Sequence, residues 1–179
     1  MFTVEDTNLP GLKLVRPRIF TDLRGSFVKT FHAGVFEKLG LAFQPLEEFF
    51  SVSRREVVRG MHFQLPPSAH SKLVYCVSGR VLDVVVDLRK SSPTFGQFAS
   101  RELTAENREM FFIPVGFAHG FRSMQDETVM VYQTSTVHAP ECDAGILWNS
   151  FGFDWGTAAP VINERDQRFP GLKEFVSPF

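Results

Sequence analysis

The chain has 179 residues, 44% of them hydrophobic and 22% charged, which is typical of a soluble globular protein and predicts one domain over residues 1–179. The net charge is −1 and no run of lysine or arginine occurs, which argues against a nucleic-acid-binding surface. No stretch approaches the roughly 18 apolar residues of a membrane span, and the N-terminus lacks the basic and apolar regions of a signal peptide. We therefore expect a cytoplasmic protein.

Short runs of alternating or continuously apolar residues predict a mainly β protein. One helix is expected at Phe31–Leu39, because its apolar residues share one face and Gly40 can end it. Many short strands at this spacing are typical of a sandwich, jelly roll or small barrel. The predicted strands are Leu12–Arg16, Phe49–Val52, Val57–Phe63, Leu73–Val77, Val81–Leu88, Phe98–Leu103, Glu109–Ile113, Gly120–Ser123 and Val129–Thr134.

Three further local features carry a prediction. Ser78-Gly79, between two apolar runs, indicates a tight hairpin. The segment from Gly156 onward is rich in Pro, Asp and Arg, and predicts loops and a short helix packed on the β core. Cys76 lies in an apolar strand pattern, so we expect a small buried side chain rather than a disulfide partner of Cys142.

The 20 phenylalanines are unusual for a chain of this size. Their combined area exceeds what a small β domain readily buries. Aromatic side chains are also enriched in the centres of protein interfaces. The composition therefore predicts a homodimer with an aromatic-rich interface.

Four polar side chains lie in apolar, β-prone surroundings: His62, Lys72, His119 and Tyr132. Each has an ordinary explanation by itself, namely a backbone-bonded histidine, a lysine reaching water from a strand end, a loop histidine and a core tyrosine. Arg59, three residues before His62, favours a functional interpretation, because two such groups rarely serve packing alone. A base, a cation and a phenol directed into one pocket would suit proton chemistry beside a carbonyl.

A metal centre is a competing interpretation. The segment Pro114-x-Gly116-x-x-His119 resembles the second signature of the cupin superfamily of β-jelly rolls. The first cupin signature supplies a His-x-His pair, whereas this chain has His70-Ser71-Lys72 in that region. A cation in the middle of a ligand set opposes metal binding. We therefore expect a cupin-type fold without a metal.

Several longer motifs, spread from about Leu9 to Pro170, resemble those of the dTDP-4-dehydrorhamnose 3,5-epimerase family, nucleotide-sugar epimerases of the cupin superfamily. The resemblance implies a mainly β, cupin-type jelly roll or barrel with a few short helices. The motifs are Phe20–Phe27, Val58–Gln64, Asp83–Gly96, Ile113–Phe121, Gly145–Asn149 and Asn163–Asp166.

The resemblance implies a substrate and a set of catalytic residues. The substrate would be a nucleotide-diphosphate 4-keto-6-deoxyhexose of deoxysugar biosynthesis, of the O-antigen or polysaccharide type, whose C3 and C5 protons are acidified by the ketone. His62 would remove a proton, and Asp166 would orient the imidazole. Lys72 would stabilise the enolate oxygen. Tyr132 would return a proton to the opposite face, without NAD or any other cofactor.

The remaining candidate positions are substrate contacts implied by the same resemblance. Arg24, Arg59 and His119 would contact the diphosphate or the sugar, since guanidinium groups suit phosphate oxygens. The other candidates for substrate binding are Lys29, Glu47, Phe49, His138, Asp143 and Arg165.

Three places in the sequence, five residues in all, depart from the family pattern. The chain has Glu47-Glu48-Phe49 where Gln-Asp-Asn is usual, Lys29 where glutamate is usual, and His138 where tyrosine is usual. These changes predict an altered nucleotide sugar, with inversion at C3, C5 or both. Lys29 slightly favours a cytidine-linked over a thymidine-linked substrate, because an ammonium offers only donors and cytosine N3 is an acceptor. A 3,4-ketoisomerase of a related cupin family and a non-catalytic sugar-binding cupin are the alternatives.

Overall fold

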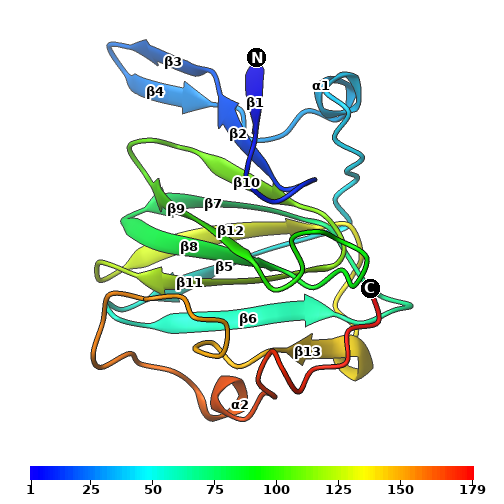
Figure 1. Cartoon of the computed structure of the whole chain (residues 1–179). Coiled ribbons are helices and arrows are strands. Elements are labelled where there is room, and N and C mark those ends of the chain that lie inside the picture. Colours follow the sequence, from blue (N-terminus) through cyan, green and yellow to red (C-terminus); the bar gives the residue numbers. More distant parts are fainter.

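Two antiparallel β-sheets face each other in the computed structural model, which describes residues 1–179 (Figure 1). The six-stranded sheet has the order β1 (Phe2–Asp6), β2 (Lys13–Pro17), β10 (Met110–Ile113), β7 (Lys72–Ser78), β12 (Thr128–Thr134) and β5 (Glu47–Ser53). The five-stranded sheet has the order β13 (Asp143–Gly145), β6 (Val58–Gln64), β11 (Phe117–Ser123), β8 (Arg80–Asp87) and β9 (Phe98–Thr104). This is the predicted jelly-roll class.

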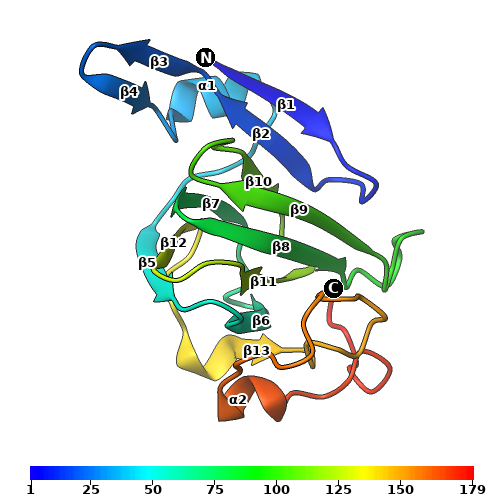
Figure 2. The same cartoon turned by 90° about the vertical axis from the view of Figure 1, so that its left-hand side faces the viewer.

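A separate hairpin and three short helical segments complete the chain. The hairpin consists of β3 (Ile19–Asp22) and β4 (Gly25–Val28), and it projects beyond the sheets (Figures 1 and 2). The helical segments are α1 (Ala33–Lys38), α2 (Glu164–Gln167) and a 3₁₀ turn at Pro140–Cys142. No helix is long and apolar enough to cross a membrane.

All nine strands predicted from the sequence are confirmed within a few residues, and so is the helix before Gly40. The prediction missed the four strands β1, β3, β4 and β13. Strand β1 and the hairpin carry mostly exposed side chains, and β13 is only three residues long. Segments of this kind have little of the hydrophobic alternation that reveals a strand in a sequence.

The predicted hairpin at Ser78-Gly79 is wrong, although the turn itself exists. Strand β7 pairs with β10 and β12, whereas β8 pairs with β11 and β9, so the turn carries the chain from one sheet to the other. Gly79 makes this possible, because its φ is +76° and a Cβ there would lie 2.5 Å from Thr128 Oγ1. The apolar side chains of both strands then face each other across the core.

The hydrophobic core has three layers. The layer between the sheets contains Val74, Val85, Phe121 and Met130, among other side chains of both sheets. The other layers cover the outer faces, one beneath α1 and one beneath the C-terminal segment. Central strands such as β7 and β8 are therefore buried on both faces, and this explains their nearly continuous apolar sequence. Cys76 is buried and free, as predicted.

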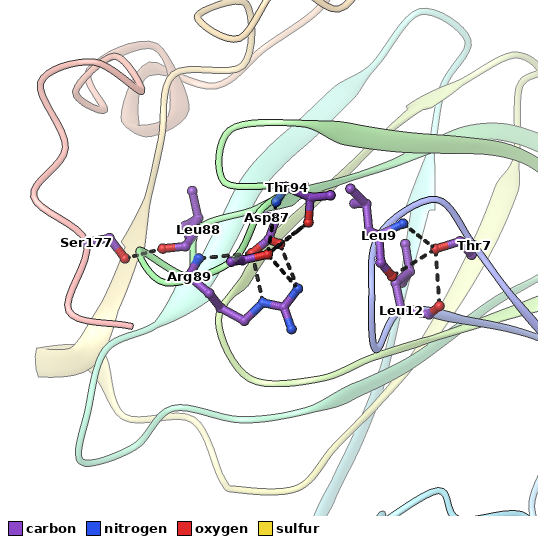
Figure 3. Close-up of polar contacts among 9 residues, drawn as sticks. Thr7, Leu9, Leu12, Asp87, Leu88, Arg89, Thr94 and Ser177 are labelled. Atoms are coloured by element: carbon purple, nitrogen blue, oxygen red, sulfur yellow. Dashed lines mark hydrogen bonds and ion pairs between the residues drawn. The ribbon is translucent and has the colours of Figure 1, made fainter.

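A buried carboxylate organises the loop after β8 (Figure 3). Asp87 has no exposed surface, and its two oxygens accept from Arg89 Nε at 2.8 Å and Arg89 Nη2 at 2.6 Å. The hydroxyls of Ser92 and Thr94 each donate to Asp87 Oδ2 at 2.6 Å. The Arg89 guanidinium also lies 4.3 Å from the centre of the Phe117 ring. We call this cluster of Asp87, Arg89, Ser92 and Thr94 the Asp87 clasp.

The C-terminal segment is attached to the same loop. Ser177 Oγ donates to the carbonyl of Leu88, as Figure 3 shows, and the N–H of Lys90 donates to the carbonyl of Phe179 at 3.0 Å. Phe175 and Phe179 pack edge-on against Phe63 of β6. The clasp thus connects the end of β8 to the segment that covers the outer face of the five-stranded sheet.

Removing the carboxylate should destabilise the protein. We expect Asp87→Ala to lower the free energy of unfolding by about 3 kcal/mol, because Arg89 would lose its buried partner. Burial opposes ionisation of Asp87, but the bonds from Arg89, Ser92 and Thr94 outweigh it and bring its pKa to about 2, below the ordinary 3.8. The contribution is therefore complete above pH 3.8 and disappears as the pH falls through 2. Urea unfolding at several pH values measures it.

The matched control is Asp6→Ala, which removes an exposed ion pair with Lys13. Such surface pairs are worth about 1 kcal/mol or less. An effect of Asp87→Ala no larger than that of the control would contradict the proposed role of the clasp.

Candidate active site

One pocket of about 360 Å³ opens between the two sheets. Strands β5, β7 and β12 of the six-stranded sheet contribute to one side, and β6 and β11 of the other sheet contribute to the opposite side. Only four of its sixteen lining residues are hydrophobic, which is unusual for an interior space. The lining residues are Glu47, Phe49, Ser51, Arg59, His62, Phe63, Gln64, His70, Lys72, His119, Phe121, Tyr132, Thr134, His138, Asp143 and Arg165.

A β-bulge in β6 directs both Arg59 and His62 into this pocket. On β11, His119 pairs with His62 and Phe121 pairs with Arg59, so three residue steps on β6 oppose two on β11. Simple alternation would place two side chains three positions apart on opposite faces. The extra residue restores them to one face. The bulge is formed at Gly60, whose φ of +150° suits glycine.

His62 and Asp166 form a hydrogen-bonded pair. The distance between His62 Nε2 and Asp166 Oδ2 is 2.9 Å, and the Asp166 side chain is 1% exposed. A carboxylate can only accept, so we assign the hydrogen to Nε2, where it donates to Asp166 rather than accepting from the nearby Arg165 guanidinium, and leave Nδ1 as the basic nitrogen. Burial opposes ionisation of Asp166, but its bonds to His62, the Gly60 N–H and Arg165 outweigh burial and lower its pKa.

The C-terminal segment brings Asp166 to its position. The N–H of Val58 donates to the carbonyl of Val161, and the N–H of Val161 donates to the carbonyl of Glu56, so the segment runs beside the start of β6. The Asn163 side chain then caps α2 by accepting from the Asp166 N–H at 2.7 Å. The predicted short helix in this segment is therefore the element that supplies the partner of His62.

Cations surround the imidazole. Arg165 Nη2 lies 2.9 Å from His62 Nε2, and Arg165 is itself paired with Asp143 at 2.6 Å and with Asp166 at 3.1 Å. Burial lowers the pKa of His62, the charges of Lys72 and Arg165 lower it further, and Asp166 opposes them. The result favours a neutral imidazole, which is the form that can accept a proton.

Lys72 extends from the first residue of β7 across the space between the sheets. Its ammonium donates to the carbonyl of His62 at 3.1 Å. Burial lowers the pKa of Lys72 to about 8, although Asp143 and Asp83 oppose this effect. Lys72 is thus a cation held beside the basic residue, and not a strand-end lysine directed to water.

Tyr132 faces the pocket from β12. Its hydroxyl lies 3.0 Å from Ser51 Oγ, and its ring stacks on Phe49 with centroids 4.8 Å apart. Strands β5 and β12 are paired with Tyr132 opposite Phe49, so Ser51 is the diagonal neighbour on the same face. Burial raises the pKa of Tyr132 above its ordinary value, so the phenol keeps its proton and can act as an acid.

His119, predicted as a substrate contact, lines the pocket but is almost completely buried. It is 3% exposed, and its Nε2 donates to Asp83, 2.9 Å from Oδ2. Burial raises the pKa of Asp83 despite the opposing effects of His119 and Lys72. The His119 ring is also 6.2 Å from that of Tyr132, so this buried pair supports the inner end of the pocket.

The other predicted contacts divide into two groups. Glu47, Phe49, His138, Asp143 and Arg165 all line the pocket, and Glu47 accepts from the His138 N–H at 2.6 Å. In contrast, Arg24 and Lys29 are exposed and lie outside it. Arg24 lies in the turn of the β3–β4 hairpin and pairs with Asp22 at 2.6 Å.

The sequence prediction missed several pocket or supporting residues, including Ser51, Gln64, His70 and Asp83. Gln64 donates to His70 Nδ1 at 3.1 Å, and burial lowers the pKa of His70 to about 3. Only Asp83 had a visible signal, because a carboxylate inside an apolar strand needs a buried partner. No group of three or more His, Cys, Asp or Glu side chains is arranged to hold a metal ion.

The family model described as dTDP-4-dehydrorhamnose 3,5-epimerase matches residues 6–174. The curated dTDP-4-dehydrorhamnose 3,5-epimerase of Shigella flexneri is 40% identical over 176 residues, covering 95% of this chain and 97% of that protein.

Two solved structures show the same architecture. The epimerase from Bacillus anthracis, with TDP and PPi bound, has a TM-score of 0.93 and 35% identity, covering 96% of this chain and 99% of that chain. The enzyme from Legionella pneumophila in complex with dTDP-4-keto-L-rhamnose has a TM-score of 0.94 and 32% identity, covering 98% of this chain and 95% of that chain.

Proposed function

Since the chain belongs to the dTDP-4-dehydrorhamnose 3,5-epimerase family, we propose that it inverts both C3 and C5 of a thymidine-diphosphate-linked 4-keto-6-deoxyhexose. The protein is an isomerase that acts on a nucleotide-linked 4-keto-6-deoxy sugar in deoxysugar biosynthesis.

The observation that carries the proposed mechanism is the origin of the two proton-transfer groups. His62 belongs to β6 of the five-stranded sheet, whereas Tyr132 belongs to β12 of the six-stranded sheet, and both line one pocket. A sugar between the sheets would therefore meet a base on one side and an acid on the other. Inversion of a carbon needs this arrangement, because the proton leaves one face and returns to the opposite face.

The first half of the reaction is proton removal. Nδ1 of His62 takes the proton from the carbon beside the C4 ketone, and Asp166 stabilises the imidazolium that forms. The electron pair moves into the ketone, which becomes an enolate. The ammonium of Lys72 is the cation placed to stabilise that oxygen, and the pocket strengthens this interaction by excluding water.

The second half is proton return. Tyr132 gives its phenolic proton to the other face of the same carbon, and the ketone re-forms. His62 then releases its proton, and the tyrosinate regains one. Nothing is oxidised or reduced overall. The same sequence at the second carbon completes the double inversion that the family description names.

The nucleotide is inferred from two observations. The relatives are described as acting on dTDP-linked sugars, and the two solved structures contain TDP or a dTDP-sugar. The expected preference for cytidine depended on Lys29, which is exposed and lies outside the pocket of its own chain. Thymidine is therefore the better supported base.

The predicted homodimer also remains a proposal, supported by exposed aromatic side chains. Strand β5 is an edge strand on which Phe49 is 46% exposed and Phe50 is 67% exposed. The β3–β4 hairpin exposes Phe20 at 45% and Phe27 at 62%. An open sheet edge with aromatic groups is a ready surface for a second chain. A second copy would also let a hairpin carrying Arg24 and Lys29 approach the partner's pocket.

The catalytic roles are tested by solvent-deuterium incorporation at C3 and C5, followed by NMR. His62→Ala should abolish exchange at both carbons, a loss on the order of 10²-fold or more, because His62 is the pocket histidine that Asp166 orients and keeps basic. Tyr132→Phe should still exchange protons but should not accumulate the inverted sugar.

Two matched variants serve as controls. His32→Ala changes an exposed histidine outside the pocket, and Tyr75→Phe changes the only other tyrosine, which bonds Thr30. Both should behave like the wild type. Exchange at the wild-type rate in His62→Ala would remove His62 from the mechanism, and normal inversion by Tyr132→Phe would assign the acid to another group.

Nucleotide choice is tested by comparing kcat/KM for thymidine-linked and cytidine-linked substrates. We expect the wild type to prefer the thymidine-linked sugar. If Lys29 reads the base across a dimer, Lys29→Glu should shift the preference by about tenfold, as expected for a hydrogen bond to a charged group. A wild-type preference for cytidine would overturn the proposed nucleotide.

The dimer is tested by sedimentation equilibrium. The wild type should sediment at twice the 20.3 kDa mass of the chain. Phe50→Ser should weaken the association, because it removes an aromatic group from the exposed edge. Val176→Ser, which changes an exposed apolar side chain on the C-terminal segment, should not. A monomeric wild type at micromolar concentration would contradict the proposal.

A further inference from the structure

Each inversion leaves the acid without its proton. Tyr132 begins as a phenol and ends as a tyrosinate, so it must be reprotonated before it can act again. The residue is 8% exposed, and one face of its ring is covered by Phe49. Tyr132 is therefore reached from the pocket, and a sugar bound there would separate it from solvent, so a route for the returning proton is needed.

The hydroxyl of Tyr132 has one hydrogen-bond partner in the protein, the hydroxyl of Ser51 at 3.0 Å. Ser51 is half-buried and lines the pocket on β5, the edge strand of its sheet. A serine hydroxyl is both a donor and an acceptor, so it can pass a proton on without becoming charged. Its neighbour Ser53 is not equivalent, because it accepts from Arg59 Nε at 3.1 Å.

We propose that Ser51 is a positioning residue that relays protons between solvent and Tyr132. The step is balanced: Ser51 gives its hydroxyl proton to the tyrosinate oxygen while its own oxygen takes a proton from a water molecule in the pocket. The water molecule becomes a hydroxide ion, and the proton that the His62 imidazolium releases converts it back to water. This inference rests on the proposed role of Tyr132 as the acid.

The surroundings of Tyr132 favour this assignment. Burial and the nearby carboxylate of Asp83 both raise the pKa of Tyr132, whereas the bond to Ser51 lowers it. A tyrosinate beside a buried carboxylate is unfavourable, so it strongly tends to take up a proton. The charge of Arg59 acts in the opposite direction and lowers the pKa of Tyr132, but burial and Asp83 outweigh it. The Ser51 hydroxyl is the group placed to deliver that proton.

The relay predicts a difference between the first turnover and later ones. With enzyme in excess over the thymidine-linked sugar, Ser51→Ala should invert the first carbon at nearly the wild-type rate, because Tyr132 is already protonated. A sugar inverted at one carbon should then accumulate. In steady state, kcat should fall on the order of 10²-fold, the scale of a lost proton-transfer group, with little change in KM.

Two variants define the controls. Ser51→Thr keeps the hydroxyl and should restore steady-state turnover, whereas Ser100→Ala changes an exposed serine on β9 and should have no effect. Rapid-quench NMR measures the first turnover. Equal slowing of the first and later turnovers, or an unchanged kcat in Ser51→Ala, would overturn the relay. Absence of inversion by the wild type would instead reject the proposed function, and inversion by Tyr132→Phe would reject its assigned acid.

Discussion

The pocket depends on the close approach of two glycines on neighbouring strands. A Cβ on Gly60 of β6 would lie 2.6 Å from the Cα of Gly120 of β11, and a Cβ on Gly120 would lie 2.8 Å from the carbonyl oxygen of Arg59. Contacts this short exclude any side chain at either position. The bulge forms at this point, and it turns Arg59 and His62 to the same side. Without it, simple alternation would direct one of them to the outer face of the sheet.

The polar groups of the pocket form a connected set. His62 is held by Asp166, and Lys72 is held by the His62 carbonyl. Around them, burial consistently disfavours charge on the imidazole, the ammonium and the phenol. The base is therefore kept neutral and the acid is kept protonated. The pKa of Lys72 is lowered to about 8, closer to the pH of a neutral solution. These are the states that proton transfer beside a ketone requires.

The sequence alone was sufficient to predict the strands with strong apolar patterns and most of the pocket residues that lie in family motifs. It was insufficient where three-dimensional pairing decides the outcome. The apolar runs around Gly79 resemble a hairpin, yet the two strands pair with different partners and belong to different sheets. Likewise, Ser51 is an ordinary strand serine in the sequence, and only the diagonal register with Tyr132 gives it a role. Arg24 and Lys29 carry motif positions, but one chain does not bring them to the pocket.

Asp166, the partner of His62, comes from a part of the chain more than a hundred residues away, and this separation has a consequence for folding. Asp166 reaches the imidazole only when the segment containing Val161 has docked beside β6. Segments with few buried contacts open more readily than the sheets that they cover. An intermediate with both sheets formed would therefore contain a pocket of nearly complete shape whose base lacks its orienting carboxylate. Recovery of activity during refolding therefore requires the docking of this segment as well as the formation of the β core.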